Sequence, residues 1–160
     1  MSPSLVDEAL RRLGRTPPDL AGFAVLWAGR DPEASVGTVE GWRRLGDRSL
    51  RLGEPLLAYD VLNAGLKGHP RDVRLRQLLA LALARSGAAG RANEILSRLR
   101  AEGSEDEETL GILARTHKDL AAAARTPAAR SARLRDAART YLAAFAKHAG
   151  YYSGINAAAT

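Results

Sequence analysis

A 34-residue spacing of small and apolar residues constrains this chain more than any other feature of its sequence. The spacing is clearest between residues 39 and 72, at Trp42, Leu45, Gly46, Ala58, Leu62 and Pro70. The next 34 residues, 73 to 106, keep the register with Leu79, Ala80, Ala92 and Leu96. Apolar residues that recur at steps of three and four predict amphipathic helices. Two consecutive units in one register therefore predict helix pairs that bury their apolar faces against neighbouring pairs.

The composition agrees with a helical fold and argues against several kinds of chemistry. Only 5% of the residues are aromatic, and cysteine is absent. The lack of cysteine excludes disulfides, thiolate metal sites and cysteine nucleophiles. His69, His117 and His148 are far apart and have no metal-ligand spacing. No phosphate-loop, serine-elbow or zinc-protease motif occurs either. We therefore expect a protein that is not an enzyme and has neither cofactor nor metal.

The 34-residue pattern resembles the tetratricopeptide repeat. The resemblance implies an all-α fold, a tetratricopeptide-like α-solenoid of antiparallel helix pairs. We expect a degenerate N-terminal helical pair at 1–38 that caps the stack. Repeats are expected at 39–72, at 73–106 and at 107–149 with an insertion, and a fourth begins at 150–160.

The sequence does not determine the local structure of two regions. Phe23 and Trp27 are spaced for burial in the N-terminal pair, and the alternative is an aromatic ligand cage. In the third repeat, the apolar face of the second helix arrives 12 residues late, at Ala138, Leu142 and Phe145. We expect the added residues to extend the first helix by several turns, with a break at 126–127. Ser104, three residues before Glu107, is expected to cap that first helix.

The C-terminal segment carries a second resemblance. Residues 151–158 read Tyr-Tyr-Ser-Gly-Ile-Asn-Ala-Ala. This segment resembles the Tyr-Tyr-x-Gly-Ile-Asn-x-Ala signature of the TRAFs-binding family, which occurs in apoptosis signal-regulating kinases and in many bacterial proteins. The chain resembles a bacterial-type member of this family. The resemblance implies a helical regulatory module within a larger signalling protein. A structural interpretation of the same residues is that Gly154 permits close helix packing.

The tetratricopeptide resemblance also implies which residues face the concave groove. Positions 2, 5, 9, 12 and 13 of each first helix line that groove. In this sequence the candidate peptide-binding residues are Arg43, Asp47, Arg51, Arg74, Gln77, Arg85, Arg115 and Lys118. Arginine matches carboxylates with two parallel hydrogen bonds, so a protein or peptide with an acidic segment is the expected partner. We expect reversal of the charges of Arg43 and Arg74 to leave folding nearly intact.

Charge distribution keeps two other functions open. Residues 1–124 hold 18 basic and 17 acidic residues, whereas residues 125–160 hold six basic residues and one acidic residue. The basic 125–139 stretch could bind nucleic acid, although no aromatic residue stands among its arginines for base stacking. The other alternative is a structural spacer that self-associates through its C-terminal end. We expect a cytoplasmic protein without a membrane segment, since neither a signal-peptide layout nor a long apolar run is present.

Overall fold

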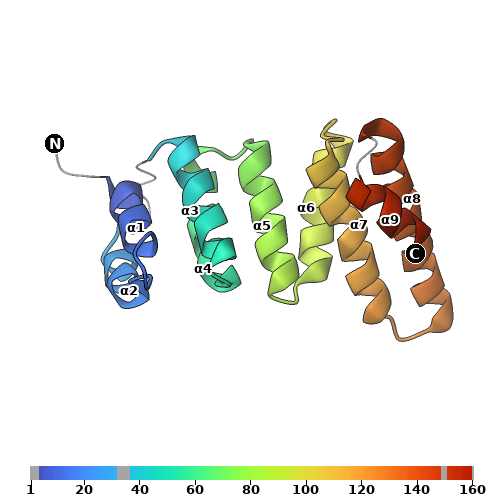
Figure 1. Cartoon of the computed structure of the whole chain (residues 1–160), viewed down its shortest axis with the longest axis horizontal. Coiled ribbons are helices and arrows are strands. Elements are labelled where there is room, and N and C mark those ends of the chain that lie inside the picture. Colours follow the sequence, from blue (N-terminus) through green and yellow to red (C-terminus); the bar gives the residue numbers. More distant parts are fainter. Residues whose placement is uncertain (1–3, 32–36, 149–150, 160) are drawn as a thin grey trace. The chain divides into compact units, whose positions relative to one another are not determined.

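The computed structural model describes residues 4–31, 37–148 and 151–159, except for the side chains of 151–153 (Figure 1). All regular secondary structure in these residues is helical, and no helix among them is long and apolar enough to cross a membrane. The fold class predicted from the sequence, all-α with tetratricopeptide-like helix pairs, is confirmed. The elements are α1 (Leu5–Leu13), α2 (Leu20–Ala28), α3 (Val39–Arg51), α4 (Pro55–Gly68), α5 (Val73–Arg85), α6 (Ala89–Ala101), α7 (Glu107–Ala122), α8 (Pro127–His148) and α9 (Tyr151–Ala158).

The chain divides into two compact units, Met1–Ala82 and Leu83–Thr160, which are described separately. Their boundary lies within α5, inside the span of the second predicted repeat. In the first unit α1 packs against α2 and α3, and α3 packs against α4. In the second unit α7 packs against α6 and α8, and α9 packs against α8.

Small residues bring α3 and α4 into close contact. A Cβ atom added at Gly46 would lie 2.4 Å from a methyl carbon of Leu62. One added at Gly65 would lie 2.9 Å from the Cβ of Trp42. Gly53, at the turn between the helices, has a φ of +78°, which L side chains rarely adopt. The helices α3 and α4 can therefore pack this closely only because Gly46 and Gly65 have no side chain.

The N-terminal pair has an aromatic core. Phe23 and Trp27 are 2% and 8% exposed, and their rings stack with centroids 5.5 Å apart. Trp27 meets Trp42 of α3 edge to face at 6.3 Å. The guanidinium of Arg30 lies 3.9 Å from the Trp27 ring centre. The predicted core role of this aromatic pair is confirmed, because the ring faces are occupied by protein groups.

The predicted register of α8 is wrong by one residue. The side chains buried on this helix are Ala137, Thr140, Tyr141 and Ala144, whereas Leu142 and Phe145 are 55% and 45% exposed. The core-facing positions thus arrive 11 residues late rather than 12. A shift of one residue turns a helix face by about 100°, so Leu142 and Phe145 leave the side that packs on α7.

The added residues also lie elsewhere than expected. Helix α7 has 16 residues against 13 in α3, whereas α8 has 22 against 14 in α4. Most of the insertion therefore lengthens the second helix and not the first. The break is at the expected place, since α8 begins at Pro127 and the hydroxyl of Thr126 accepts a hydrogen bond from the Ala129 N–H at 3.2 Å.

Asp106, and not Ser104, caps α7. Its carboxylate accepts hydrogen bonds from the N–H and the hydroxyl of Thr109 at 2.9 and 2.7 Å. Asp106 directly precedes the first helical residue and is extended, which is the capping geometry, whereas Ser104 stands two residues too early. At the other end of the unit, a Cβ atom added at Gly154 would lie 3.0 Å from the Phe145 ring. The close approach of α9 to α8 expected at Gly154 is confirmed.

Candidate functional site

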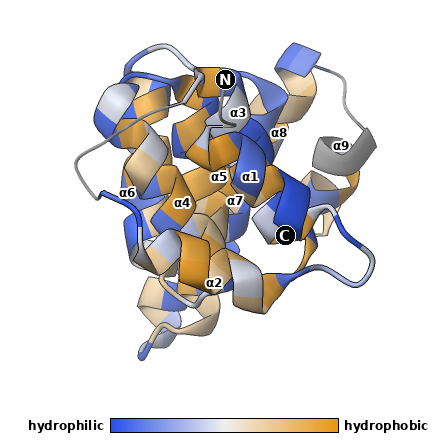
Figure 2. Cartoon of the chain, turned by 90° about the vertical axis from the view of Figure 1, so that its left-hand side faces the viewer, coloured by the Kyte–Doolittle hydropathy of each residue, from blue (hydrophilic) through white to orange (hydrophobic). Residues whose placement is uncertain are grey.

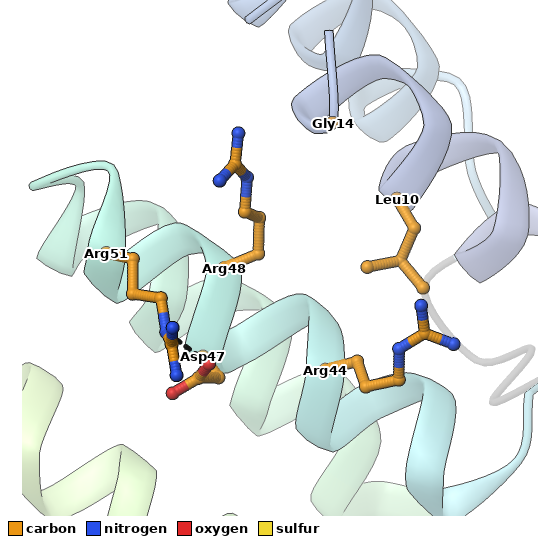
Figure 3. A pocket seen from close by; sticks show the side chains of 6 residues that line it. All are labelled: Leu10, Gly14, Arg44, Asp47, Arg48 and Arg51. Atoms are coloured by element: carbon orange, nitrogen blue, oxygen red, sulfur yellow. Dashed lines mark ion pairs between the residues drawn. The ribbon is translucent and has the colours of Figure 1, made fainter.

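Helix α3 is bordered by two hollows in the first unit. One, of about 470 Å³, lies between α1 and α3 (Figure 3) and is lined by Leu10, Gly14, Arg44, Asp47, Arg48 and Arg51. The other, of about 290 Å³, lies between α3 and the start of α5 and is lined by Glu40, Arg43, Arg44, Asp47, Arg51, Arg74 and Leu78. Three residues line both hollows, so the two form one continuous surface, which we call the α3 face. The three shared residues are Arg44, Asp47 and Arg51.

The helical period places these charged side chains together. Residues 44, 47, 48 and 51 are three or four apart and share one side of α3. The opposite side is buried and carries Trp42, Leu45 and Ser49. Five arginines and two carboxylates line the two hollows. The α3 face is therefore basic.

Arg43 has a structural partner within this face. The Nε of Arg43 donates to Asp72 Oδ1 at 3.1 Å, and its Nη2 donates to Asp72 Oδ2 at 2.5 Å. Asp72 also accepts from the Leu75 N–H at 2.8 Å, at the start of α5. The pair therefore ties α3 to α5. Reversing the charge of Arg43 would place a carboxylate against Asp72, so the pairing gives Arg43 a role in folding that the prediction for the Arg43 and Arg74 reversals did not include.

The protonation state of Asp72 reflects this pairing. Burial alone would raise the pKa of its carboxyl. Hydrogen bonds from Arg43 and from the Leu75 N–H offset the burial, so the pKa is held below its usual value. The charged carboxylate is therefore the form that stabilises the folded unit.

Replacing Asp72 by Asn is expected to lower the free energy of unfolding at pH 7 by about 1–2 kcal/mol, because a charge-assisted hydrogen-bond pair is lost. A lowered carboxyl pKa contributes stability above the unfolded value of about 3.9, and this contribution is lost as the pH falls through the folded value. The difference between parent and variant should thus shrink below about pH 4. Urea unfolding at pH 7 and pH 3 checks both points, and an equal difference at the two pH values would rule out this role for the pair.

The remaining arginines of the α3 face differ in how they are held. Arg51 pairs with Asp47 at 2.7 Å, and Arg48 donates to the Leu13 carbonyl at 2.9 Å. Arg44 is exposed and makes no hydrogen bond or ion pair with any residue that the structure describes. In Figure 3 the side chains of Arg44, Arg48 and Arg51 follow one another along α3. Arg44 is thus the arginine most available to a ligand.

Four of the eight predicted groove residues lie together in the first unit. Arg43, Asp47, Arg51 and Arg74 all line the hollow beside α5. Gln77 is 5% exposed and does not line it, and its amide oxygen accepts a 3.4 Å hydrogen bond from Arg74. The other three predicted residues belong to the second unit. Arg85 and Arg115 are exposed, and Lys118 is half-buried.

Sequence reasoning missed Arg44 and Arg48. The resemblance to known repeats directs attention to fixed groove positions, and these two residues occupy none of them. A signal was nevertheless present, because Arg44, Arg48 and Arg51 recur at steps of four and three along one helix face.

The histidines take no part in this face. His117, in the second unit, lies 3.4 Å from the Asn93 amide nitrogen, and burial lowers its pKa. His69 lies 3.5 Å from the Gly37 carbonyl, and His148 lies 2.7 Å from the Glu105 carbonyl. Among the described residues, no group of three or more acidic or histidine side chains could hold a metal ion.

Comparison with known proteins places the repeats in a family. A family model described as Tetratricopeptide Repeats-Sensor matches residues 54–160. The chain belongs to this family. Tetratricopeptide-type repeats generally mediate protein–protein interaction and are typically non-catalytic. No curated protein and no solved structure matches the chain. The family match begins after α3, so the α3 face is assigned from its own geometry.

Proposed function

We propose that this member of the Tetratricopeptide Repeats-Sensor family is a non-catalytic interaction scaffold whose α3 face binds an acidic segment of a partner protein. The observation that carries the proposal is the position of Arg44. This side chain is exposed, has no partner among the described residues, and lines both basic hollows. A ligand that spans the two hollows would therefore meet it.

The chemistry of the face favours a peptide with several carboxylates. Among the described residues, Arg44 has a guanidinium without a partner, and Arg51 is held only by an exposed pair with Asp47, a kind of pair that contributes little to stability. An incoming carboxylate can exchange for that pair at low cost. Arg43 is hydrogen-bonded to Asp72. We expect it to keep this partner when a ligand binds and to contribute only its positive charge to the face.

Reversing the charges of Arg44 and Arg51 tests the proposal. The double variant Arg44→Glu/Arg51→Glu should weaken binding of a fluorescent glutamate-rich peptide by at least about tenfold, since loss of two charge-assisted contacts exceeds 1.4 kcal/mol. Fluorescence anisotropy at low and high salt measures the effect. Both residues are exposed, so the circular dichroism spectrum and melting temperature should stay close to those of the parent.

A matched control separates this site from general attraction to a basic protein. Arg130 and Arg135 on α8 are exposed, and Arg130→Glu/Arg135→Glu changes the net charge by the same amount. The control should bind the peptide like the parent. Equal weakening by both variants, or no binding by the parent, would contradict the proposal and favour the spacer function.

The same control examines nucleic-acid binding through residues 125–139. Tyr141, the aromatic residue that follows this basic stretch, is 1% exposed and cannot stack on a base. We therefore rank nucleic acid below an acidic protein segment. Loss of oligonucleotide binding in Arg130→Glu/Arg135→Glu alone would reverse this ranking.

A regulatory role in a larger cytoplasmic signalling protein is the wider setting that we propose. The word sensor in the family description supports it. The resemblance of residues 151–158 to the TRAFs-binding signature of bacterial-type members also supports it, although the side chains of Tyr151 and Tyr152 lie outside the described residues. In this setting the acidic segment would belong to a partner or to another part of the same signalling protein.

A further inference from the structure

Helices α2 and α4 border a mainly apolar hollow that contains one charged residue. The hollow has a volume of about 320 Å³. It is lined by Leu20, Phe23, Ala24, Trp27, Ala28, Glu54 and Leu57. Figure 2 shows α2 largely in the hydrophobic colours. Among the described residues of this lining, only Glu54 is charged, so the hollow combines apolar walls with a single negative charge.

Small side chains keep the hollow open on its α2 side. Leu20, Ala24 and Ala28 are four residues apart and follow one line along α2, and all three are exposed. The aromatic residues of the lining, Phe23 and Trp27, are only 2% and 8% exposed. A side chain that enters from outside would therefore lie against two alanine methyl groups, with the buried aromatic pair as the inner wall.

The carboxylate of Glu54 has no partner of its own. Glu54 directly precedes α4, yet its side chain makes no capping hydrogen bond. It also makes no hydrogen bond or ion pair with any other residue that the structure describes, and it is half-buried. The N-terminus of α4 stabilises a negative charge at this position, but it leaves the carboxylate oxygens without a hydrogen-bond donor. A cation beside these apolar walls would be attracted more strongly than one in open water.

We propose that this hollow binds a lysine or arginine side chain of a partner protein, with the apolar stem between α2 and α4 and the charged end at Glu54. Charge selects this occupant. Lysine and arginine both join a long apolar stem to a cationic end, which matches an apolar hollow with one carboxylate. A purely apolar side chain would fill the space but would bury the Glu54 carboxylate further without a partner, which is unfavourable. An acidic side chain would be repelled.

This hollow is separate from the α3 face. The two surfaces have no lining residue in common. They also select opposite charges, because five arginines line the α3 face and would repel a basic residue. The variants used below leave the α3 face unchanged, so the two proposals can fail independently.

Nuclear magnetic resonance titration with two peptides tests the proposal and locates the binding. One peptide is end-capped Gly-Leu-Lys-Leu-Gly, and the other has norleucine in place of lysine, which keeps the apolar stem and removes the charge. The parent should bind the lysine peptide at least about tenfold more tightly, with shifts of the Ala24, Ala28 and Glu54 amide signals. Glu54→Gln should abolish this preference. Asp60→Asn removes one negative charge from an exposed position on α4 outside the hollow and should retain it.

A second pair of variants tests the space in the hollow. Ala24→Met should occupy it and weaken binding of the lysine peptide by at least about tenfold. Ala21→Met, at an exposed position of α2 that does not line the hollow, should bind like the parent. Both changes replace an exposed alanine by another good helix former, so the circular dichroism spectra should match that of the parent.

Three results would overturn the proposal. Equal binding of the two peptides by the parent would mean that the hollow accepts any apolar chain. Absence of binding, or shifts confined to residues outside the hollow, would place no basic side chain there. A parent of about twice 17.1 kDa by light scattering that becomes a single chain in Ala24→Met would assign the hollow to a second copy.

Discussion

Replacing Trp42 by Ala is expected to lower the free energy of unfolding by about 3–5 kcal/mol, the cost of deleting a large buried aromatic side chain. Trp42 is 1% exposed and meets Trp27 edge to face. It also fills the space that Gly65 leaves open on α4. Removal would therefore leave a cavity where α2, α3 and α4 meet. Urea unfolding monitored by circular dichroism measures the loss.

A milder change separates volume from hydrogen bonding. The indole nitrogen of Trp42 is buried and has no hydrogen-bond partner among the described residues. Trp42→Phe keeps an aromatic ring and removes this unsatisfied donor, so its cost should stay below about 1.5 kcal/mol. If Trp42→Ala cost no more than Leu56→Ala, at a position 69% exposed, the packing described for the first unit would be wrong.

Tyr141→Ala should cost a comparable amount in the second unit, about 3–5 kcal/mol. The ring is 1% exposed and lies on the side of α8 that contains Ala137 and Ala144. The adjacent substitution, Leu142→Ala, should cost less than about 1 kcal/mol because that side chain is 55% exposed. Thermal or urea unfolding of the two variants side by side decides between the two registers.

The register of α8 in the structure and the register predicted from the sequence give opposite results for these two variants. The 34-residue spacing with a 12-residue insertion predicts that Leu142 is in the core. The structure assigns that role to Tyr141. A large loss for Leu142→Ala with a small loss for Tyr141→Ala would restore the sequence register and contradict the described packing of α7 on α8.

The uninterrupted repeats were the most predictable part of the fold. The frame residues Trp42, Leu45, Ala58, Leu62, Ala80, Ala92 and Leu96 are all buried. Two helices per repeat follow from periodicity because each must bury one face, and the frame repeats without gaps from 39 to 106. After the insertion, the 34-residue frame no longer determines which residues of α8 face the core. Leu142 and Tyr141 are adjacent and both apolar enough to be buried, so sequence alone could not choose between them.

The candidate site was less predictable, for a different reason. Sequence position indicates which side of α3 an arginine occupies, but it does not say whether that arginine is already engaged. The partner of Arg43 is Asp72, 29 residues away, and this pairing depends on how α3 meets α5. Arg44, its neighbour in sequence, has no such partner among the described residues. Availability to a ligand is therefore a property of the fold and not of the motif.

Nuclear magnetic resonance of the arginine side chains tests the central proposal most directly. Titration with a glutamate-rich peptide should shift the Nε–H signals of Arg44 and Arg51, with those of Arg130 and Arg135 unchanged. Arg43 Nε already donates to Asp72, so its signal should move little. Shifts confined to Arg130 and Arg135, or spread equally over all exposed arginines, would contradict an acidic-peptide site on the α3 face.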